Sequence, residues 1–366
     1  MKAKIIRSIS YCVLATLSLL PLSLAAQNKS ESIDQYVQDY HQKGLFHGAV
    51  LVSKSSEAIF KKGYGFANME WDAPFEPDTR MDIGSLTKSF TSLLVLQQVE
   101  RGEIKLDATI NDYLPEYRKD TGARVTIHHL LSNTSGIPDI MDYPEMRSKL
   151  IKLSYTLDYA IKNFCSGDLK YEPGSKFEYS SSGFLILGAI LERVTGKSYE
   201  SLLEERILKP AGMTNTGIDG DSLILKKRAS GYIRKKDYFI REPYMNMDLA
   251  TSAGGIYSTV DDLFKFNQAL NTDKLLSKEY RGIMFKPNID AFGGRGKYAY
   301  GWGVFQVPLS ESGKKKAISH GGSLYGKETL FTRLVDDDYL IVLFCNTEIG
   351  QGTLMKMMMD ITNILY

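Results

Sequence analysis

The stretch MDIGSLTKSF, residues 81–90, places three hydroxyl side chains around one lysine, Lys88. The residues that follow, as far as Gly102, carry apolar side chains at helical spacing, so the stretch is predicted to open a helix. In a helix, Lys88 lies one turn after Ser85 on the same face. The free N–H groups and the positive dipole end at a helix start can stabilise an oxyanion, so Ser85 and Lys88 are a candidate nucleophile and its base.

The same residues also fit an ordinary helix start, with Ser85 as a cap and Lys88 in solvent. The spacing Ser-x-x-Lys occurs a second time, from Ser312 to Lys315, in a Gly- and Lys-rich turn between two expected strands. Nothing would fix the geometry of that second copy or remove water from its lysine. The pattern alone therefore does not decide between a cap and a catalytic pair.

The first 26 residues combine a basic start, a short apolar run and small residues suited to cleavage after Ala25 or Ala26. This arrangement is typical of a secretory signal peptide, and its apolar core is too short to span a membrane. We expect residues 1–26 to be removed and the mature chain, 27–366, to be periplasmic or secreted, with no transmembrane segment.

Removing the three basic residues of the signal changes the net charge from +2 to about −1. A nearly neutral chain argues against nucleic acid or an anionic membrane as a partner, and it fits a monomer. Hydrophobic residues make up 43% of the sequence and charged residues 24%, which is ordinary for a globular protein. We therefore expect a small-molecule or peptide substrate as the partner, such as a cell-wall peptide in view of the expected export.

Strand signals are concentrated at the two ends of the chain. Residues 47–68 predict two strands joined by a polar turn, and the last seventy residues give four short runs typical of an antiparallel meander. Helical segments and loops dominate between them. We predict an α/β (α+β) fold, in which residues 27–104 and 256–366 form an antiparallel sheet flanked by helices. Residues 105–255 form an inserted, mostly helical lobe, with a cleft for a site between the two parts.

Two cysteines remain after loss of the signal, Cys165 and Cys345. Cys345 lies in an apolar run and is expected to fill a core, although an oxidising compartment would permit a disulfide between the two. The five histidines do not fall at metal-ligand spacing, so we expect neither a metal nor another cofactor.

Two further segments carry groups that could do chemistry. Tyr179 precedes three serines and an apolar helix, and a tyrosine there could either pack or share a proton network with a nearby lysine. The segment ISHGGSLYG, residues 318–326, lies between two expected strands and contains His320 followed by two glycines. These glycines could serve a simple turn or let a ligand approach the backbone closely.

Together these three elements resemble the serine β-lactamase and penicillin-binding protein superfamily, most closely its class C β-lactamase-like branch. The elements are Ser-x-x-Lys at a helix start, a tyrosine before a second helix, and a basic residue with glycine on a late strand. The resemblance extends from about residue 32 to the end of the chain. Other matching segments are TIHHLLSNTSGIPD (126–139), YEPGSKFEYSSSGFLILGAILERVTGKSY (171–199) and SAGGIYSTVDDLFKF (252–266).

The resemblance implies a role for each matching residue. It assigns Ser85 as the nucleophile that forms an acyl-enzyme, and Lys88 as a group that helps to deprotonate it. Tyr179 would act as general base in acylation and then as acid toward the leaving group, although a neutral Lys88 could accept the proton instead. The backbone N–H groups of Ser85 and Ser323 would form the oxyanion hole.

Two substrate-binding positions depart from the pattern of the family. Ser181 stands where an asparagine is usual, which weakens contact with a substrate amide. His320, with Gly321 and Gly322, replaces the usual Lys-Thr-Gly element. A histidine is mostly neutral at pH 7, so the site offers less positive charge to the carboxylate of a penicillin or a D-Ala-D-Ala peptide.

We therefore predict an exported serine hydrolase that cleaves an amide or ester, of the D-peptidase or esterase type, with weak or no β-lactamase activity. Two alternatives stay open: a non-catalytic penicillin-recognising or cell-wall-binding protein of the same fold, and a true class C-like β-lactamase. A Ser-His-Asp hydrolase of the α/β-hydrolase class is excluded, because the chain contains no G-x-S-x-G motif.

Overall fold

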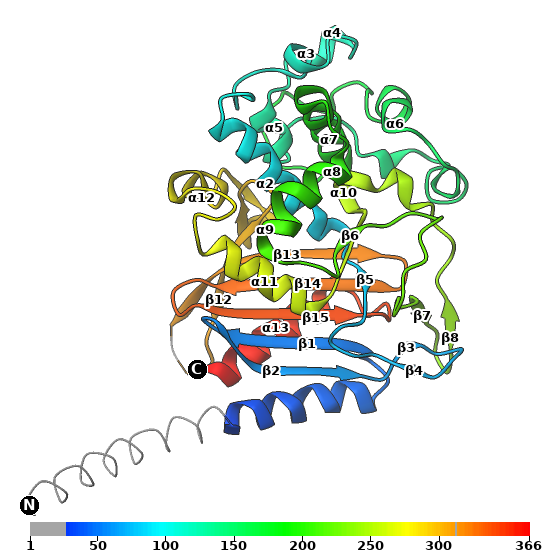
Figure 1. Cartoon of the computed structure of the whole chain (residues 1–366), viewed down its shortest axis with the longest axis vertical. Coiled ribbons are helices and arrows are strands. Elements are labelled where there is room, and N and C mark those ends of the chain that lie inside the picture. The colour runs from blue at the N-terminus through cyan, green and yellow to red at the C-terminus, as the bar shows by residue number, and fades with distance from the viewer. Residues whose placement is uncertain (1–26, 312) are drawn as a thin grey trace, which may run out of the picture.

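The computed structural model describes residues 27–311 and 313–366. The predicted signal peptide and Ser312 of the second Ser-x-x-Lys copy lie outside these residues. The chain is built around an eight-stranded antiparallel sheet, in which strands from the end of the sequence lie beside strands from its start (Figure 1). In spatial order the strands are β10 (Ile289–Ala291), β11 (Gly296–Tyr298), β12 (Gly303–Pro308), β13 (Lys314–Leu324), β14 (Lys327–Leu334), β15 (Tyr339–Cys345), β1 (Gly48–Lys54) and β2 (Glu57–Tyr64).

The two ends of the chain meet where β1 pairs with β15, in a register that sets Gly48 opposite Cys345. Both strands are buried on both faces, so their sequences are almost continuously apolar. Alternate residues of β15 enter two separate cores. Leu340, Val342 and Phe344 belong to the core on the side of the helical lobe, and Ile341, Leu343 and Cys345 to the core under the terminal helices.

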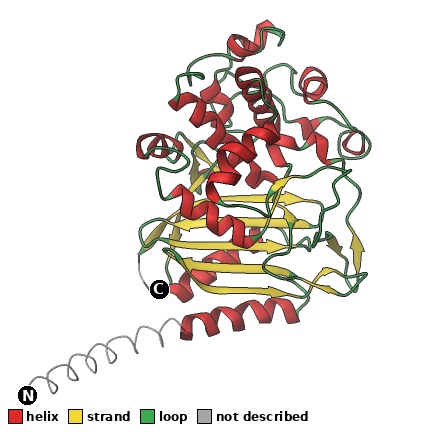
Figure 2. Ribbon diagram, in the orientation of Figure 1, coloured by secondary structure: helices red, strands yellow, loops and turns green. Residues whose placement is uncertain are grey.

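Helices gather in one half of the molecule, and the large sheet lies in the other half together with a helix near each end of the chain (Figure 2). Residues 27–42 and α13 (Gln351–Leu365) form helices that pack against the second core. The remaining helices are α2 (Thr87–Glu100), α3 (Ile110–Tyr113), α4 (Lys119–Gly122), α5 (Ile127–Leu131), α6 (Leu157–Phe164), α7 (Ser181–Thr195), α8 (Tyr199–Leu203), α9 (Lys209–Ala211), α10 (Thr251–Gly254), α11 (Val260–Leu270) and α12 (Lys278–Met284). Short 3₁₀ turns are η1 (Gly84–Leu86), η2 (Ile140–Asp142), η3 (Leu150–Lys152), η5 (Met247–Leu249) and η6 (Phe292–Gly294), and η4 (Glu204–Leu208) is a π-helical turn.

The predicted fold class is confirmed: an antiparallel sheet built from both chain ends, flanked by helices, with a helical insertion. The second predicted strand is shorter than expected. It ends at Tyr64 because Gly65 adopts a positive φ of 68°, and the chain then turns into a separate hairpin. That hairpin consists of β3 (Phe66–Asn68) and β4 (Ala73–Pro74).

Five other short strands form two small sheets outside the large one. β5 (Met81–Asp82), β9 (Ile256–Ser258) and β6 (Gly217–Ile218) make one of them, and β7 (Tyr232–Arg234) and β8 (Phe239–Arg241) make the other. Three of these strands lie between residues 217 and 241, a segment in which no strand was predicted from the sequence. Each has two or three residues, too few for a visible alternation of apolar and polar side chains.

The last residues of β13 have a strand neighbour on one side. β12 begins at Gly303, which pairs with Ser319, whereas the pairing with β14 continues to Leu324. Residues 320–324 therefore present a free strand edge. None of the helices in the described ranges is both long and apolar enough to cross a membrane.

Candidate active site

The turn that carries Ser85 lies directly against β13. Gly84 has a positive φ of 51°, and a Cβ there would sit 3.0 Å from the backbone nitrogen of Ser323. A Cβ on Gly322 would sit 1.8 Å from the carbonyl oxygen of Ile83. Two glycines therefore let the backbones of η1 and β13 touch, which brings the segments of Ser85 and Ser323 together.

Lys88 is fully buried one turn after Ser85, at the start of α2. Its ammonium group donates hydrogen bonds to the carbonyl oxygen of Ala253 at 2.7 Å, the hydroxyl of Ser85 at 3.2 Å and the hydroxyl of Ser181 at 3.3 Å. Among the described residues no carboxylate lies within ion-pair distance of it. The structure thus contradicts the reading of Lys88 as a solvated surface lysine.

Burial lowers the pKa of the Lys88 ammonium from its ordinary 10.5 to about 7. The carboxylate of Asp139 opposes this shift but does not cancel it. A pKa of about 7 makes a neutral amine accessible near pH 7, at hydrogen-bond distance from the Ser85 hydroxyl. A neutral amine in this position can accept a proton from a serine hydroxyl.

Tyr179 lies two residues before α7, and its ring faces the same lysine. The Lys88 nitrogen is 5.0 Å from the centre of the Tyr179 ring. The tyrosine hydroxyl is buried and has no hydrogen-bond partner among the described residues. Burial raises the pKa of Tyr179, and the nearby Ser85 hydroxyl lowers it by less, so the phenol keeps its proton at neutral pH.

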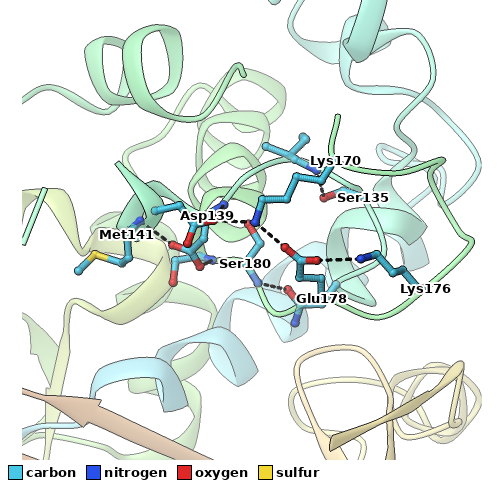
Figure 3. A network of polar contacts seen from close by, with 11 residues as sticks. Ser135, Asp139, Met141, Lys170, Lys176, Glu178 and Ser180 are labelled. Carbon is cyan, nitrogen blue, oxygen red and sulfur yellow. Dashed lines mark hydrogen bonds and ion pairs between the residues drawn. The ribbon is translucent and has the colours of Figure 1, made fainter. Parts of the chain in front are cut away.

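Asn133 holds the segment around Tyr179 from both sides. Its carbonyl oxygen accepts a hydrogen bond from the Glu178 N–H at 2.9 Å, and its side-chain oxygen accepts one from the Ser180 N–H at 3.1 Å. A salt-bridge network extends outward from the same segment, because the Lys170 ammonium pairs with Glu178 (Figure 3). Lys170 also pairs with Asp142. These contacts fix the backbone on either side of the tyrosine.

His320 lies on the free edge of β13 and is neutral. Its Nδ1 is 2.7 Å from the carbonyl oxygen of Gly321, so Nδ1 carries the hydrogen and Nε2 can accept one from the Tyr298 hydroxyl, 3.2 Å away. Burial lowers the pKa of His320 to about 4; the Gly321 carbonyl opposes the shift, and the charge of Lys88 adds to it. The His320 ring centre lies 6.3 Å from that of Tyr179.

Ser181 is the first residue of α7 and contacts two groups of the site. Its hydroxyl lies beside Lys88, as described above, and its N–H donates to Asp139 at 2.7 Å. Asp139 also accepts from the Met141 N–H at 2.8 Å, so it orders the chain before η2 and the start of α7 together (Figure 3). Sequence reasoning missed Asp139, because no pattern in its neighbourhood connects it with Lys88.

The structure brings together all the residues predicted for the site. Ser85, Tyr179, His320, Gly321, Gly322 and Ser323 line one cavity of about 630 Å³, with Lys88 and Ser181 directly behind Ser85. Within residues 27–311 and 313–366 no group of three His, Cys, Asp or Glu side chains could hold a metal ion. Serine, amine and phenol thus meet in one partly desolvated cavity, an arrangement suited to acyl transfer.

A second buried lysine lies under the same backbone turn. The Lys327 ammonium contacts the carboxylates of Asp82, at 2.8 Å, and Glu242, at 3.0 Å. Asp82 precedes η1 by two residues, and Lys327 follows Ser323 by four. The ion pair therefore joins the chain leading into Ser85 to the hairpin that follows the free edge of β13.

Comparison with known proteins gives the family of the chain. Residues 33–356 match the beta-lactamase family. Penicillin-binding protein 4* of Bacillus subtilis is 27% identical over 337 residues, which cover 88% of this chain and 73% of that protein. Other curated relatives are longer, and the chain matches 63% of the length of several of them.

Solved structures give the same result. The crystal structure of a penicillin-binding protein from Bacillus halodurans is similar, with a TM-score of 0.77, 26% identity, and coverage of 88% of this chain and 97% of that one. The D-amino acid amidase of Ochrobactrum anthropi SV3 shares the fold, with a TM-score of 0.78, 21% identity, and coverage of 93% and 98%. The chain belongs to the beta-lactamase family and is a serine hydrolase of that family.

Proposed function

We propose that the protein cleaves an amide or ester bond through an acyl-enzyme on Ser85, as a D-peptidase or esterase with weak or no β-lactamase activity. The observation that carries the proposal is the state of Lys88, a buried amine with a pKa of about 7 at hydrogen-bond distance from a serine hydroxyl. A lysine that only supported the fold would be expected to keep a carboxylate partner when buried.

In the first step, the neutral Lys88 amine accepts the proton of the Ser85 hydroxyl as its oxygen attacks the substrate carbonyl carbon. The carbonyl oxygen becomes an oxyanion, which the N–H groups of Ser85 and Ser323 stabilise. The contact between Gly84 and the Ser323 nitrogen supports this pairing, because it brings the two segments together.

In the second step, the bond between the carbonyl carbon and the leaving group breaks, and the leaving group takes a proton from the Tyr179 phenol. The Lys88 ammonium then returns a proton to the Tyr179 oxygen. The raised pKa of Tyr179 favours this role of proton donor over that of first base. Water then attacks the acyl-enzyme carbonyl and gives a proton to the Lys88 amine. The bond between the acyl group and the Ser85 oxygen breaks, the Lys88 ammonium returns that proton to the Ser85 oxygen, and the acid leaves, so the protons balance over the cycle.

The neutral state of His320 supports an ester, or a peptide bound without a strong carboxylate contact, as substrate. A histidine with a pKa of about 4 supplies no fixed positive charge at neutral pH, so it cannot hold a substrate carboxylate as a lysine would. The similar proteins named above, penicillin-binding proteins and a D-amino acid amidase, fit a substrate of the D-amino acid or peptide type.

The test uses covalent probes on the purified mature protein, with two serine variants. A fluorophosphonate and a fluorescent penicillin are added separately to the wild type, to Ser85→Ala, and to Ser312→Ala as a control with the same Ser-x-x-Lys spacing. We expect strong fluorophosphonate labelling of the wild type and the control, and none of Ser85→Ala. Labelling that survives Ser85→Ala would refute the assignment of the nucleophile.

Two other functions remain open, and turnover assays on the same purified protein distinguish them from the proposed one. The names of two similar proteins make penicillin recognition a second candidate. Stable penicillin labelling without ester or peptide turnover would favour a penicillin-recognising protein. Rapid nitrocefin hydrolysis would favour a β-lactamase.

We also propose that the protein is exported and acts as a monomer, on the basis of its N-terminal sequence and its nearly neutral mature charge. Fractionation of cells that carry the full-length chain, followed by size-exclusion chromatography, tests both points. Protein retained at full length inside the cell would contradict export.

A further inference from the structure

The cavity at Ser85 does not end at the reacting groups. It continues past the start of β12 and reaches the face of the sheet that α13 covers. The far part of the cavity, called the apolar arm below, is lined by side chains from β12, β14 and α13. They are Phe305, Val307, Leu330, Met355, Met358 and Met359.

Two glycines at the passage into the apolar arm let neighbouring side chains pack directly on the strand backbones. A Cβ on Gly303 would lie 2.5 Å from the ring of Phe305, and a Cβ on Gly321 would lie 2.2 Å from the side-chain oxygen of Gln351. Phe305 and Gln351 therefore lie flat against β12 and β13. The Gln351 amide also donates to the Gly322 carbonyl at 2.7 Å, which holds that side chain to the strand.

The apolar arm offers a ligand little polar chemistry. Ser319, which lines it, already contacts the Phe331 carbonyl oxygen at 3.0 Å and the Thr332 hydroxyl at 2.8 Å. The six side chains that define the arm are all uncharged and apolar. The charged lining residue Arg295 is exposed, and its guanidinium donates to the Phe292 carbonyl oxygen at 3.0 Å.

The three methionines suit a binding surface. Met358 is buried, whereas Met355 and Met359 are half-buried and form part of the cavity wall. Methionine is unbranched and polarizable, so a methionine wall adapts to ligands of different shape. Phe292 and Phe305, whose ring centres lie 5.0 Å apart, add an aromatic surface to the same cavity.

We propose that the apolar arm binds an aliphatic or aromatic group on the leaving-group side of the substrate, a proposal that rests on the acyl-enzyme function given above. The leaving group must face its proton donor, Tyr179. Tyr179 lines the same cavity as the residues at the passage into the apolar arm. A leaving group that accepts the Tyr179 proton can extend past His320 and Gly321 into the arm. The enzyme thereby selects esters or amides of apolar alcohols or amines.

The first test compares acetate esters that differ only in the alcohol. Hydrolysis of ethyl, butyl and octyl acetate is followed by acid release at constant pH, for the wild type, Met355→Trp and Lys356→Trp. Met355→Trp fills the arm, and Lys356→Trp adds the same bulk at an exposed position of α13. We expect kcat/KM of the wild type to rise about tenfold or more from ethyl to octyl acetate, since each buried methylene can give roughly a fourfold gain.

In Met355→Trp the ratio of kcat/KM for octyl acetate to kcat/KM for ethyl acetate should fall to about one, and Lys356→Trp should keep the wild-type ratio. Equal use of ethyl and octyl acetate by the wild type would overturn the proposal. A comparison of ethyl acetate with ethyl octanoate varies the acid instead of the alcohol. A preference that follows the length of the acid and not that of the alcohol would also overturn the proposal.

A binding measurement separates this proposal from the proposed function. N-phenyl-1-naphthylamine, which fluoresces in apolar sites, is bound to Ser85→Ala and displaced with 1-octanol. We expect displacement in Ser85→Ala and at least about tenfold weaker binding of the probe when Met355→Trp is added. If 1-octanol displaces the probe but the wild type cleaves no ester, the acyl-enzyme function is rejected and the apolar site is retained. Ester cleavage without probe binding would reject the apolar site alone.

Discussion

Lys88 and Lys327 are both buried, and their surroundings shift the pKa of the two ammonium groups in opposite directions. The ammonium of Lys88 contacts one carbonyl and two hydroxyl oxygens, and burial brings its pKa down to about 7. Burial also lowers the pKa of Lys327, but the carboxylates of Asp82 and Glu242 outweigh it and hold that pKa above the usual range. Burial alone therefore does not decide the charge of a lysine; its nearest carboxylates do.

The two lysines also act on the same turn of the chain in different ways. Lys88 offers an amine to the Ser85 hydroxyl, whereas Lys327 acts as a fixed cation that ties Asp82, before η1, to the hairpin after β13. We expect replacement of the first to change chemistry and replacement of the second to change stability. The predictions below test this division, from the largest expected effect to the smallest.

Lys88→Met should lower kcat/KM for an activated ester by about a thousandfold or more, because it removes the proton acceptor of Ser85. Lys88→Arg should be almost as inactive, since a guanidinium does not become neutral at this pH. Steady-state kinetics with a p-nitrophenyl ester measure both. Activity of Lys88→Met within tenfold of the wild type would show that Tyr179, and not Lys88, is the base.

Lys327→Met should lower the free energy of unfolding by roughly 3–5 kcal/mol, because it removes the ion-pair partner of the buried Asp82 carboxylate and of the partly buried Glu242. Urea denaturation measures the loss, and Lys327→Arg should recover part of it. The matched control is the exposed Lys356, which pairs with Asp360 on α13. Lys356→Met should lower the free energy of unfolding by less than about 1 kcal/mol. Similar losses for Lys327 and Lys356 would contradict the role of the buried ion pair.

The stability of the wild type relative to Lys88→Met should rise with pH between about 7 and 10. The pKa of Lys88 is about 7 in the folded state and near 10.5 in the unfolded chain, so the unfolded state binds more protons in this window. The difference in unfolding free energy should change by up to about 1.4 kcal/mol per pH unit. Urea melts of both proteins at four pH values measure it, and a constant difference would mean that Lys88 stays charged.

Asp139→Asn should shift the rising limb of the pH–rate profile to lower pH by roughly half a unit to one unit. The Asp139 carboxylate raises the pKa of Lys88, so its removal lowers that pKa and frees the amine earlier. An asparagine oxygen can still accept the Ser181 N–H. Asp142→Asn, which changes an exposed partner of Lys170, is the control and should leave the profile unmoved. A shift to higher pH in Asp139→Asn would contradict the electrostatic assignment.

Local patterns singled out part of the site, although only their combination, in the order of a known family, assigned roles to the residues. The spacing of Ser85 and Lys88, the tyrosine before α7 and the glycines after His320 each lie within a few residues of a helix or strand boundary. Apolar runs at both chain ends were enough to predict the large sheet. These features depend on short segments, whose periodicity and turn residues are visible in the sequence.

The sequence did not reveal the surroundings that decide the chemistry. The Ala253 carbonyl contacts Lys88 from α10, and the Asp139 carboxylate, in the chain before η2, raises the Lys88 pKa. Asp82, the partner of Lys327, lies 245 positions from it in the sequence. Contacts of this kind depend on tertiary packing, so no local pattern reports whether a buried lysine has a carboxylate partner. The choice between Lys88 and Tyr179 as base was open for the same reason.

The pairing of β1 with β15 also has a consequence for how the protein reaches its folded state. Residues 48 and 345 must meet before the sheet is complete, which gives the fold many contacts between distant parts of the chain and favours slow folding. η1 and α2 emerge early from the ribosome, whereas β13 and its partner strands emerge near the end. A partly made chain therefore cannot assemble the Ser85 cavity, and a hydrolase built this way is inactive until its last strands are in place.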